Sequence, residues 1–333
     1  MRYSVIIPTH NRRDSLLRCL EALARQRLGP NQFEVIVVDD GSTDDSAKAV
    51  KDRGFPFALR VCEQANGGAS RARNLGAEEA KGEYLVFTED DVLPDDHWLE
   101  SAEVHLRKDP SIDVLEGKTV TGPANASVRR YDVPGIPSFI PCNLFVRSLT
   151  YRATGGYDPE FFDGQAHLYF REDADLGFRL LDMGARVAIA HDVIVSHPPQ
   201  FTRLRDVFRH VRRYVFDPLL YRKHPLHYRS LIEVKRIAGL TIHRAHHLVA
   251  SVYLFDLLWL LYTIVLAPGP EILGQVILAF LCAAFFKFKY QGAGGFRLSR
   301  VIDIGAFAIV PLVYLWAQVQ GSFRYGTFGS LIP

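Results

Sequence analysis

The sequence predicts an α/β fold with a mostly parallel sheet, followed by a helical apolar region. Over the first 200 residues, short β-branched runs alternate with amphipathic segments of helical spacing. Such alternation is typical of βαβ units. Two of the β-branched runs end in clusters of acids, and the last 87 residues hold apolar stretches close to the length that crosses a bilayer.

The first 91 residues contain the expected strands and helices in strict alternation. Strands are expected in the segments YSVIIPTHN, FEVIVVDD, FALRVCEQ and EYLVFTEDD. Helices are expected at 12–26, from an N-cap at Ser42 or Asp44 through Val50, and at 68–82; the first has apolar residues at helical spacing, namely Leu16, Leu17, Leu20, Leu23 and Ala24. The carboxyl ends of parallel strands meet at one edge of a sheet, where ligands bind. Both acidic clusters are therefore expected at a ligand-binding edge.

Charge and cysteine usage narrow the class of protein. Aspartate and glutamate outnumber lysine and arginine by 31 to 23 in residues 1–200, whereas lysine and arginine lead by 11 to 3 in residues 201–246. The basic segment adjoins apolar stretches and the rest is acidic, so nucleic-acid binding is disfavoured. The four cysteines have no paired spacing, which argues against a zinc site or a disulfide framework. The N-terminal apolar stretch is too short for a signal peptide, so the N-terminal part of the chain is expected in the cytoplasm.

The C-terminal third predicts membrane association. Segment 204–216, LRDVFRHVRRYVF, is a basic amphipathic helix that suits an anionic membrane surface; the alternative is a helix packed on the catalytic domain with a solvated basic face. Apolar stretches follow at 248–267, 272–286 and 301–319, with a basic loop between the second and third. We expect two or three transmembrane helices, with the basic side cytoplasmic. The expected domains are therefore 1–202, 203–246 and 247–333, in a multi-pass protein of the cell (inner) membrane.

Four motifs stand in the order and spacing of a known family. They are VIIPTHNR, VIVVDDGSTD, NGGASRARNLGAEEAKGEYLVFTEDD and FREDADLGFRLLDMG. Together they resemble the family-2 inverting glycosyltransferases of the bacterial and archaeal membrane-associated type. The resemblance covers roughly residues 1–200 and implies the GT-A fold, a Rossmann-like nucleotide-diphospho-sugar transferase domain.

The resemblance implies a divalent cation at the acidic triplet. In this family the triplet holds Mg²⁺ or Mn²⁺ on the donor diphosphate, and such hard cations take oxygen ligands. Asp91 is expected as the direct ligand, Glu89 as facing the sugar or ribose, and Asp90 as pointing away because neighbouring strand residues alternate faces. His197, after a late strand, is either a further metal ligand or a structural histidine.

The resemblance also implies a nucleotide-sugar site at the neighbouring strand ends. Either Asp39 or Asp40 would bind the nucleoside, with a slight preference for Asp39. The remaining contacts expected from the family motifs are Pro8, Thr9, Gly41, Asn66, Gly67, Arg71, Arg73 and Asn74. A glycine lets the backbone approach the base, and a helix start favours anions such as the diphosphate.

The motif FREDADLGFRL carries the expected catalytic base. In the family the aspartate of the Glu-Asp pair takes the proton of the acceptor hydroxyl, which here is Asp173, with Glu172 beside it. Asp175 is expected to cap the helix or pair with Arg179. Asn143 is expected on the acceptor side of the cleft.

The resemblance, taken with the apolar C-terminal stretches, implies a membrane-bound, metal-dependent, inverting transferase that moves one sugar from a nucleotide-sugar to a lipid-linked saccharide in cell-envelope or exopolysaccharide synthesis. A UDP-sugar is the favoured donor, with GDP- and dTDP-sugars open. The Gln-x-x-Arg-Trp signature of processive synthases is absent, which disfavours polymerisation. Two alternatives remain: a polyprenyl-phosphate glycosyltransferase, and a non-catalytic membrane-anchored binding protein.

Overall fold

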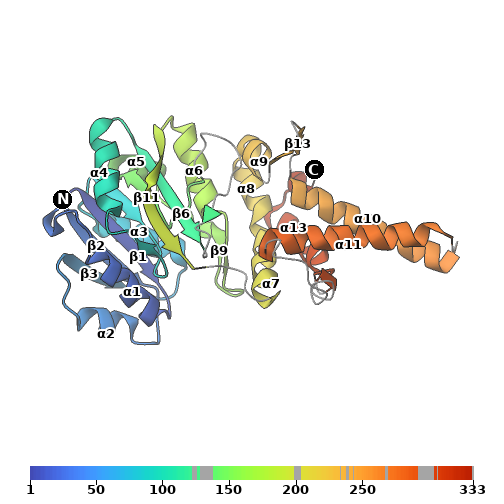
Figure 1. Ribbon diagram of the computed structural model, residues 1–333, viewed down its shortest axis with the longest axis horizontal. Helices are drawn as coiled ribbons and strands as arrows, with labels where there is room; N and C mark the ends of the chain where they lie inside the picture. Colours follow the sequence, from blue (N-terminus) through green and yellow to red (C-terminus); the bar gives the residue numbers. More distant parts are fainter. Residues whose placement is uncertain are drawn as a thin grey trace. The chain divides into compact units, whose positions relative to one another are not determined.

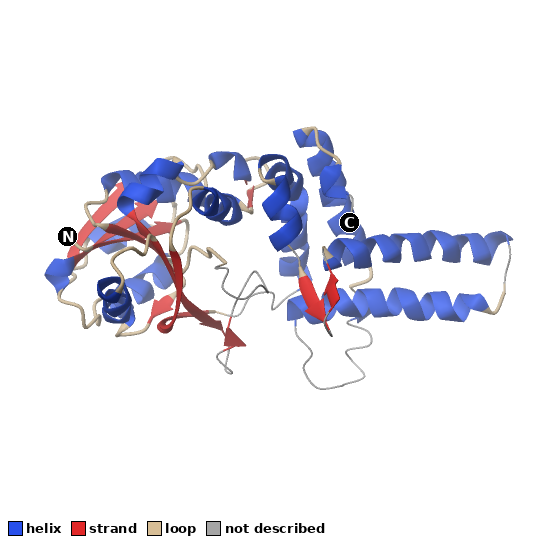
Figure 2. Cartoon of the chain, turned by 90° about the horizontal axis from the view of Figure 1, so that it is seen from above, coloured by secondary structure: helices blue, strands red, loops and turns tan. Residues whose placement is uncertain are grey.

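The computed structural model describes residues 1–121, 126–127, 138–198, 204–232, 234–237, 240–242, 244–266, 269–291, 304–305 and 307–331. The chain divides into two compact units, Met1–Pro199 and Gln200–Pro333. Each unit is described by itself (Figures 1 and 2).

The first unit is an α/β domain built on one sheet. Its strands are β1 (Tyr3–Thr9), β2 (Phe33–Asp39), β3 (Ala58–Glu63), β4 (Tyr84–Phe87), β5 (Leu93–Pro94), β6 (Val114–Thr121), β7 (Ala126–Ser127), β8 (Leu144–Arg147) and β11 (Val187–His197). Its helices are α1 (Arg13–Leu23), α2 (Ser46–Lys51), α3 (Ala69–Glu79), α4 (Trp98–Lys108), α5 (Ser148–Thr154) and α6 (Glu172–Asp182), with the short 3₁₀ turns η1 (Pro30–Gln32) and η2 (Pro159–Phe161). A separate two-stranded ribbon pairs β9 (Phe162–Asp163) with β10 (Leu168–Tyr169).

The sheet has the strand order β3-β2-β1-β4-β8-β6-β11-β5, and β7 pairs with β6. Strands β1 to β4 are parallel, as the βα alternation predicts. The other half is mixed, so the prediction of a mostly parallel sheet holds only in part: β11 runs parallel to β6, but β8 runs antiparallel to both β4 and β6, and β5 antiparallel to β11. The reason is that β6, which the chain reaches from β4 through α4, keeps the direction of β4, while β8 is inserted between these two strands in the opposite direction.

Apolar residues on both faces of the central strands bury the sheet. The side of β1 that holds Val5 and Ile7 packs in one core with Leu16 of α1 and Trp98 of α4. Helix α3 covers the opposite face, where a Cβ on Gly76 would lie 2.5 Å from Ile6. Burial on both faces explains why β1 and β2 read as continuous apolar runs and not as alternating ones.

The parallel half brings the acidic clusters to one edge. Thr9, at the end of β1, stands opposite Asp39, at the end of β2, and Asp39 stands opposite Glu63 of β3. Phe87, the last residue of β4, pairs with Ile6, so the chain that follows it runs alongside the end of β1. The predicted ligand edge is therefore formed by the residues that follow β1, β2 and β4.

The second unit is mainly helical. It contains α7 (Leu204–Arg212), α8 (Asp217–Lys223), α9 (Pro225–Leu231), α10 (Ala245–Leu266), α11 (Glu271–Gln291) and α13 (Val310–Tyr325), the 3₁₀ turns η3 (Arg213–Phe216) and η4 (Gly329–Leu331), and the short hairpin β12 (Lys235–Ile237) with β13 (Leu240–Ile242). Helices α10 and α11 form a long antiparallel pair that both views show as a hairpin (Figures 1 and 2).

The expected amphipathic helix is shorter than its pattern, because the chain changes to a 3₁₀ turn at Arg213. Its apolar face is not left open within the unit: Val207 and Val211 are fully buried, and α7 packs against α13. On the opposite side Arg205, Arg209 and Arg212 are exposed. The helix therefore presents a basic face while its apolar face serves the unit's own core.

Two helices, Ala245–Leu266 and Glu271–Tyr290, are long and apolar enough to cross a membrane. The second is longer than the apolar stretch that predicts it, because the helix continues through Lys287 and Lys289 to Gln291. The expected third stretch gives no further candidate in the described part of the chain. Residues 301–303 and 306 lie outside it, and α13 has only 16 residues, with Gln318 and Ser322 fully buried.

Candidate functional site

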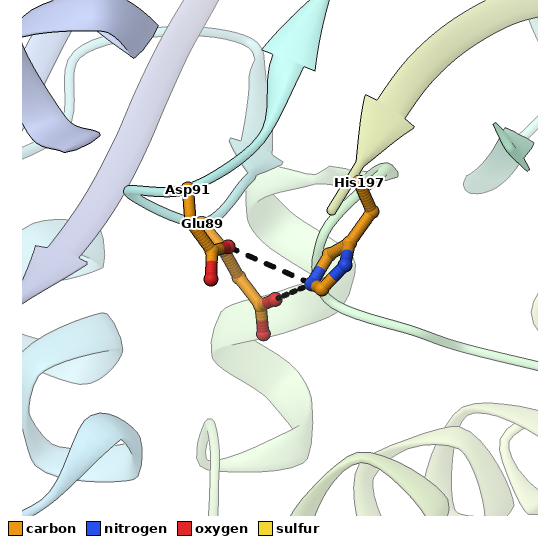
Figure 3. A group of neighbouring side chains, drawn as sticks. All are labelled: Glu89, Asp91 and His197. Atoms are coloured by element: carbon orange, nitrogen blue, oxygen red, sulfur yellow. Dashed lines mark ion pairs between the residues drawn. The ribbon is translucent and has the colours of Figure 1, made fainter. Parts of the chain in front are cut away.

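The candidate site is centred on the acidic triplet that follows β4, at residues 89–91. His197, the last residue of β11, points its Nε2 atom at two of the acids, 3.4 Å from Oε2 of Glu89 and 3.5 Å from Oδ1 of Asp91 (Figure 3). One ligand atom from each of the three residues lies within 4.8 Å of the others. Oδ1 of Asp91 is buried and has no hydrogen-bond partner among the described residues.

The third acid of the triplet, Asp90, turns toward β1. Its Oδ2 accepts a hydrogen bond from Oγ1 of Thr9 at 2.8 Å, and the Nη1 of Arg12 lies 3.2 Å from its Oδ1. The same Nη1 lies 2.5 Å from Oδ2 of Asp91. The expected alternation is visible here: Asp90 is separated from the group formed by Glu89 and Asp91, while Arg12 bridges Asp90 to Asp91.

The pKa values of these groups follow from burial and from this pairing. Burial would lower the pKa of His197, but Glu89 and Asp91 outweigh it and raise that pKa to about 9. Burial raises the pKa of Asp90 to about 6, with Arg12 and Thr9 opposing it. Burial acts in the same way on Glu89, but His197 and Arg73 lower its pKa below the usual value. The loop after β4 therefore holds two neighbouring carboxylates whose pKa values are shifted in opposite directions, upward for Asp90 and downward for Glu89.

The group formed by Glu89, Asp91 and His197 fits a divalent cation. Its donors are two carboxylate oxygens and one imidazole nitrogen, a mixed set that suits Mn²⁺ or Mg²⁺. Oδ1 of Asp91 is buried, accepts no hydrogen bond from the described residues, and is placed to ligate such a cation. Glu89, expected on the sugar side, belongs to this group by position.

At the end of β2 the two aspartates have different surroundings. Asp40 is buried, and its carboxylate accepts hydrogen bonds from the backbone N–H groups of Gly67 at 2.7 Å and Gly68 at 2.9 Å and from Nε2 of Gln64 at 2.7 Å. Asp39 accepts one hydrogen bond, from the N–H of Ser42 at 2.7 Å. Asp40 therefore holds the glycine loop, and Asp39 has the greater remaining hydrogen-bonding capacity.

A pocket of about 240 Å³ opens beside Asp39. Its lining comes from the loop after β2, from the start of α2 and from the end of β3, and consists of Asp39, Gly41, Ser42, Thr43, Asp45, Ser46, Ala47, Lys48, Glu63 and Gln64. Gly41 has a φ of +76°, and a Cβ there would lie 2.9 Å from the backbone nitrogen of Asn66. Any larger residue would collide with the Asn66 backbone, so the turn requires glycine.

The predicted phosphate-side residues separate into exposed and buried ones. Asn66 and Arg71 are exposed. Arg73 is fully buried: its guanidinium lies 5.1 Å from the ring centroid of Tyr157, with Nη2 3.5 Å from Glu89 and Nη1 3.4 Å from Glu172. Its Nε has no hydrogen-bond partner in the described part of the chain. Arg73 thus links the acidic triplet to the start of α6.

The half-buried side chain of Asn74 is held by protein groups, and its contact with the nucleotide-sugar stays a prediction. Its Oδ1 accepts from the hydroxyl of Tyr151 at 2.7 Å and from the N–H of Tyr157 at 2.8 Å, and its Nδ2 donates to the carbonyl of Tyr157 at 2.7 Å. The amide of Asn74 fixes the turn at residues 155–158, whose sequence is GGYD. A Cβ on Gly156 of this turn would lie 2.7 Å from Oδ1 of Asn74.

The predicted base and its neighbour begin α6. Glu172 and Asp173 are both buried in its first turn, where unpaired backbone N–H groups favour negative charge. Arg171 immediately before them takes a left-handed conformation with φ +75°, which is costly for a residue with a side chain. The predicted pairing of Asp175 with Arg179 is confirmed, at 2.5 and 3.0 Å.

Asn143 is buried, which argues against the direct contact with the acceptor that the resemblance implies. Its side chain is 1% exposed. Its Oδ1 accepts from Nε1 of Trp98 at 2.8 Å, and its Nδ2 donates to the carbonyls of Val193 at 2.9 Å and Lys118 at 3.2 Å. It therefore satisfies buried polar groups of α4, β6 and β11.

Two residues of the site are absent from the predicted set. Arg12 contacts Asp90 and Asp91, and Tyr157 covers the guanidinium of Arg73. Arg12 belongs to the VIIPTHNR motif, directly after the first strand, so its position at the ligand edge is visible in the sequence. Tyr157 belongs to the GGYD turn at residues 155–158, which the family motif places at the cleft, but its contact with Arg73 depends on how that turn folds onto α3.

Known proteins resemble this chain in sequence. Residues 4–176 match the family described as "Glycosyl transferase family 2". Glycosyltransferase AglE of Haloferax volcanii is 30% identical over 216 residues, which is 59% of this chain and 66% of that protein. The pre-mycofactocin glycosyltransferase of Mycobacterium tuberculosis is 30% identical over 227 residues, 61% of this chain and 44% of that protein. The matched part thus spans less than two thirds of these relatives.

Solved structures share the fold. The structure of residues 1–349 of Staphylococcus aureus TarS has a TM-score of 0.53 at 19% identity, over 98% of this chain and 93% of that one. The mannosyltransferase PcManGT of Pyrobaculum calidifontis, solved with GDP-Man and Mn²⁺, has a TM-score of 0.54 at 19% identity, over 97% and 84%. These likenesses show a GT-A-like fold. With the family match over more than half of the chain, they lead to one conclusion: the chain belongs to glycosyl transferase family 2.

Proposed function

We propose that the protein transfers one sugar from a nucleotide-sugar to an acceptor hydroxyl in a metal-dependent, inverting reaction. The observation that carries the proposal is the convergence at one sheet edge of the group Glu89, Asp91 and His197 with the pocket beside Asp39. A cation-binding group next to a nucleoside-sized pocket is what a nucleotide-diphosphate donor requires. Relatives of the same fold are described in complex with UDP-GlcNAc and with GDP-Man.

The donor would lie with its nucleoside in the pocket and its diphosphate at the acidic triplet. Asp39 accepts hydrogen bonds from the nucleoside, and the N-terminus of α3 with Arg71 faces the diphosphate. Glu89, Asp91 and His197 would hold Mg²⁺ or Mn²⁺, which would supply positive charge to stabilise the departing diphosphate. A UDP-sugar is the favoured donor, because TarS, described with UDP and UDP-GlcNAc, shares the fold.

Asp173 would act as the general base. The acceptor oxygen forms a bond to the anomeric carbon, the bond from that carbon to the diphosphate oxygen breaks, and the acceptor proton passes to the carboxylate of Asp173. Attack opposite to the leaving group inverts the configuration, and no sugar becomes linked to the enzyme. Glu172, held by Arg73, supports this carboxylate and binds the acceptor.

The acceptor is proposed to be a lipid-linked saccharide at a membrane. The supporting features are the two apolar helices α10 and α11 and the exposed arginines of α7. The α10–α11 hairpin exposes many large apolar side chains, among them Phe255, Leu258, Leu261, Val265, Leu273 and Leu281. Exposed apolar surface of this extent favours lipid contact. The catalytic unit would then face the cytoplasm from the inner membrane.

A second candidate is a transferase that loads a sugar onto polyprenyl phosphate. The same hairpin favours it, and a phosphate acceptor is already ionised, so it needs no strong base. The test supplies the detergent-purified chain with polyprenyl phosphate or with a polyprenyl-diphosphate saccharide, and follows labelled sugar into the lipid fraction.

Transfer to the saccharide by the wild type, and its loss in Asp173→Asn, would support the proposal. Transfer to polyprenyl phosphate that survives Asp173→Asn would support the second candidate. Equal transfer to soluble saccharides would contradict the lipid-linked acceptor.

A further inference from the structure

Arg12 contacts the candidate metal group from outside, and nothing in the proposed function uses it. Its Nη1 lies 2.5 Å from Oδ2 of Asp91 and 3.2 Å from Oδ1 of Asp90. The guanidinium is half-exposed, while both carboxylates are largely buried. One planar cation therefore joins two adjacent acids that would otherwise repel each other.

The contact with Arg12 gives the two carboxylate oxygens of Asp91 different surroundings. Oδ2 is held by Arg12, while Oδ1 is buried, accepts no hydrogen bond from the described residues, and faces Nε2 of His197 at 3.5 Å. A carboxylate whose outer oxygen is fixed cannot rotate freely about its last bond. Arg12 thus sets which oxygen Asp91 presents to the group that also contains Glu89.

The backbone around Arg12 is fixed by the loop that lines the pocket beside Asp39. Asn11 takes a left-handed conformation with φ +53°; its N–H donates to Oγ of Ser42 at 2.9 Å, and its Oδ1 accepts from the N–H of Thr43 at 2.7 Å. The N–H of Arg13 donates to Oδ2 of Asp44 at 2.9 Å. Ser42 and Thr43 line that pocket. The residues on both sides of Arg12 are therefore anchored to the pocket loop.

We propose that Arg12 is a positioning residue that orients the Asp91 carboxylate for the divalent cation. The inference rests on the proposed function, since it assumes a cation at Glu89, Asp91 and His197. Groups that hydrogen-bond to a ligating carboxylate typically change metal affinity 10- to 100-fold when they are removed.

The competing explanation is that Arg12 only neutralises the acids and repels an incoming cation. Arg12→Lys separates the two, because lysine keeps the charge but its ammonium ends one bond short of the place of Nη1, the nitrogen that contacts both carboxylates. Orientation predicts weaker cation binding in Arg12→Lys, whereas a role of charge alone predicts no change there and tighter binding in Arg12→Met.

The experiment measures Mn²⁺ binding to the detergent-purified full chain by electron paramagnetic resonance, without nucleotide. The chains compared are the wild type, Arg12→Lys, Arg12→Met and Asp91→Asn. Arg13→Lys and Arg13→Met are the matched controls, since the exposed Arg13 pairs with Asp14 at the surface at 3.3 Å. Thermal unfolding of each variant shows whether it is folded.

We expect Mn²⁺ dissociation constants at least 10-fold higher in both Arg12 variants, and unchanged in both Arg13 variants. Unchanged binding in Arg12→Lys, or tighter binding in Arg12→Met, would overturn the role of Arg12 while the metal group stands. Absence of saturable Mn²⁺ binding in the wild type would overturn both the role of Arg12 and the metal component of the proposed function.

Discussion

Nη1 of Arg73 lies 3.4 Å from Oε1 of Glu172, and this contact joins two motifs that are 99 residues apart. Both side chains are buried, and the other arm of the same guanidinium lies 3.5 Å from Glu89. The acids that follow β4 and the acids that begin α6 are thereby held around one cation. The proposed base, Asp173, is the next residue after Glu172.

Replacing Arg73 by methionine is expected to destabilise the first unit by about 3 kcal/mol, because it removes the cation from between two largely buried carboxylates. Arg73→Met with Glu172→Gln should recover part of the loss, since one of the charges is then removed. Urea unfolding followed by the fluorescence of Trp98 measures this, in a chain where Trp259 and Trp316 are phenylalanine. The exposed Arg71→Met is the control; equal effects of Arg71→Met and Arg73→Met would contradict the bridging role.

The raised pKa of His197 predicts a pH-dependent stability in the metal-free protein. Burial lowers that pKa, but Glu89 and Asp91 raise it to about 9, against about 6.5 in the unfolded chain. The protonated side chain therefore stabilises the fold fully below pH 6.5, and this contribution of about 3 kcal/mol is lost as the pH rises to 9.

The free energy of unfolding in EDTA should show this as a difference between the wild type and His197→Gln. The difference should be largest near pH 6 and should disappear by about pH 9.5. Asp90, whose pKa of about 6 is present in both chains, cancels in the comparison. A difference that is constant with pH would contradict the pairing of His197 with the two acids.

Gly68 is expected to tolerate no side chain. It has a φ of +85°, and a Cβ there would lie 2.6 Å from the ring of Phe162 on β9. Gly155 has nearly the same φ, +82°, but no atom within 4 Å of its virtual Cβ. Gly155→Ala should cost about 1 kcal/mol from the backbone alone, and Gly68→Ala should cost clearly more. Equal shifts of the melting temperature would contradict close packing of the glycine loop on β9.

Asn143→Ala should lower stability without changing the acceptor site. It removes the partner of the buried Trp98 N–H and of two carbonyls, which is expected to cost about 3 kcal/mol. The Michaelis constant for the acceptor should stay within about twofold in the folded protein. A large rise in that constant with little change in melting temperature would restore the acceptor-side role.

The sheet edge could be predicted from the sequence because its signals are local. A β-branched run followed by acids marks each strand end, and parallel strands bring such ends together. The direction in which an individual side chain points depends on segments that are distant in the sequence. Asn74 and Asn143 stand in suitable motifs, but buried tyrosine and tryptophan donors from distant segments take up their amides.

In the second unit, too, the apolar pattern of the sequence predicts the structure only in part. Hydropathy ends the second stretch at Phe286, yet Lys287 and Lys289 continue α11 because lysine is a good helix former. The apolar face of α7 reads like a membrane-facing one, but α13 covers it. A pattern gives the face of a helix and not the partner that buries it.

The most direct test of the central claim is nucleotide release by the detergent-purified full chain. A panel of nucleotide-sugars is supplied with Mn²⁺ and total membrane lipid, with Asp91→Asn and Asp173→Asn beside the wild type. The account predicts lipid-dependent release from one donor, lost in both variants. Release that persists in Asp91→Asn, or silence with every donor despite metal-dependent nucleotide binding, would contradict a metal-dependent transferase and favour a binding protein.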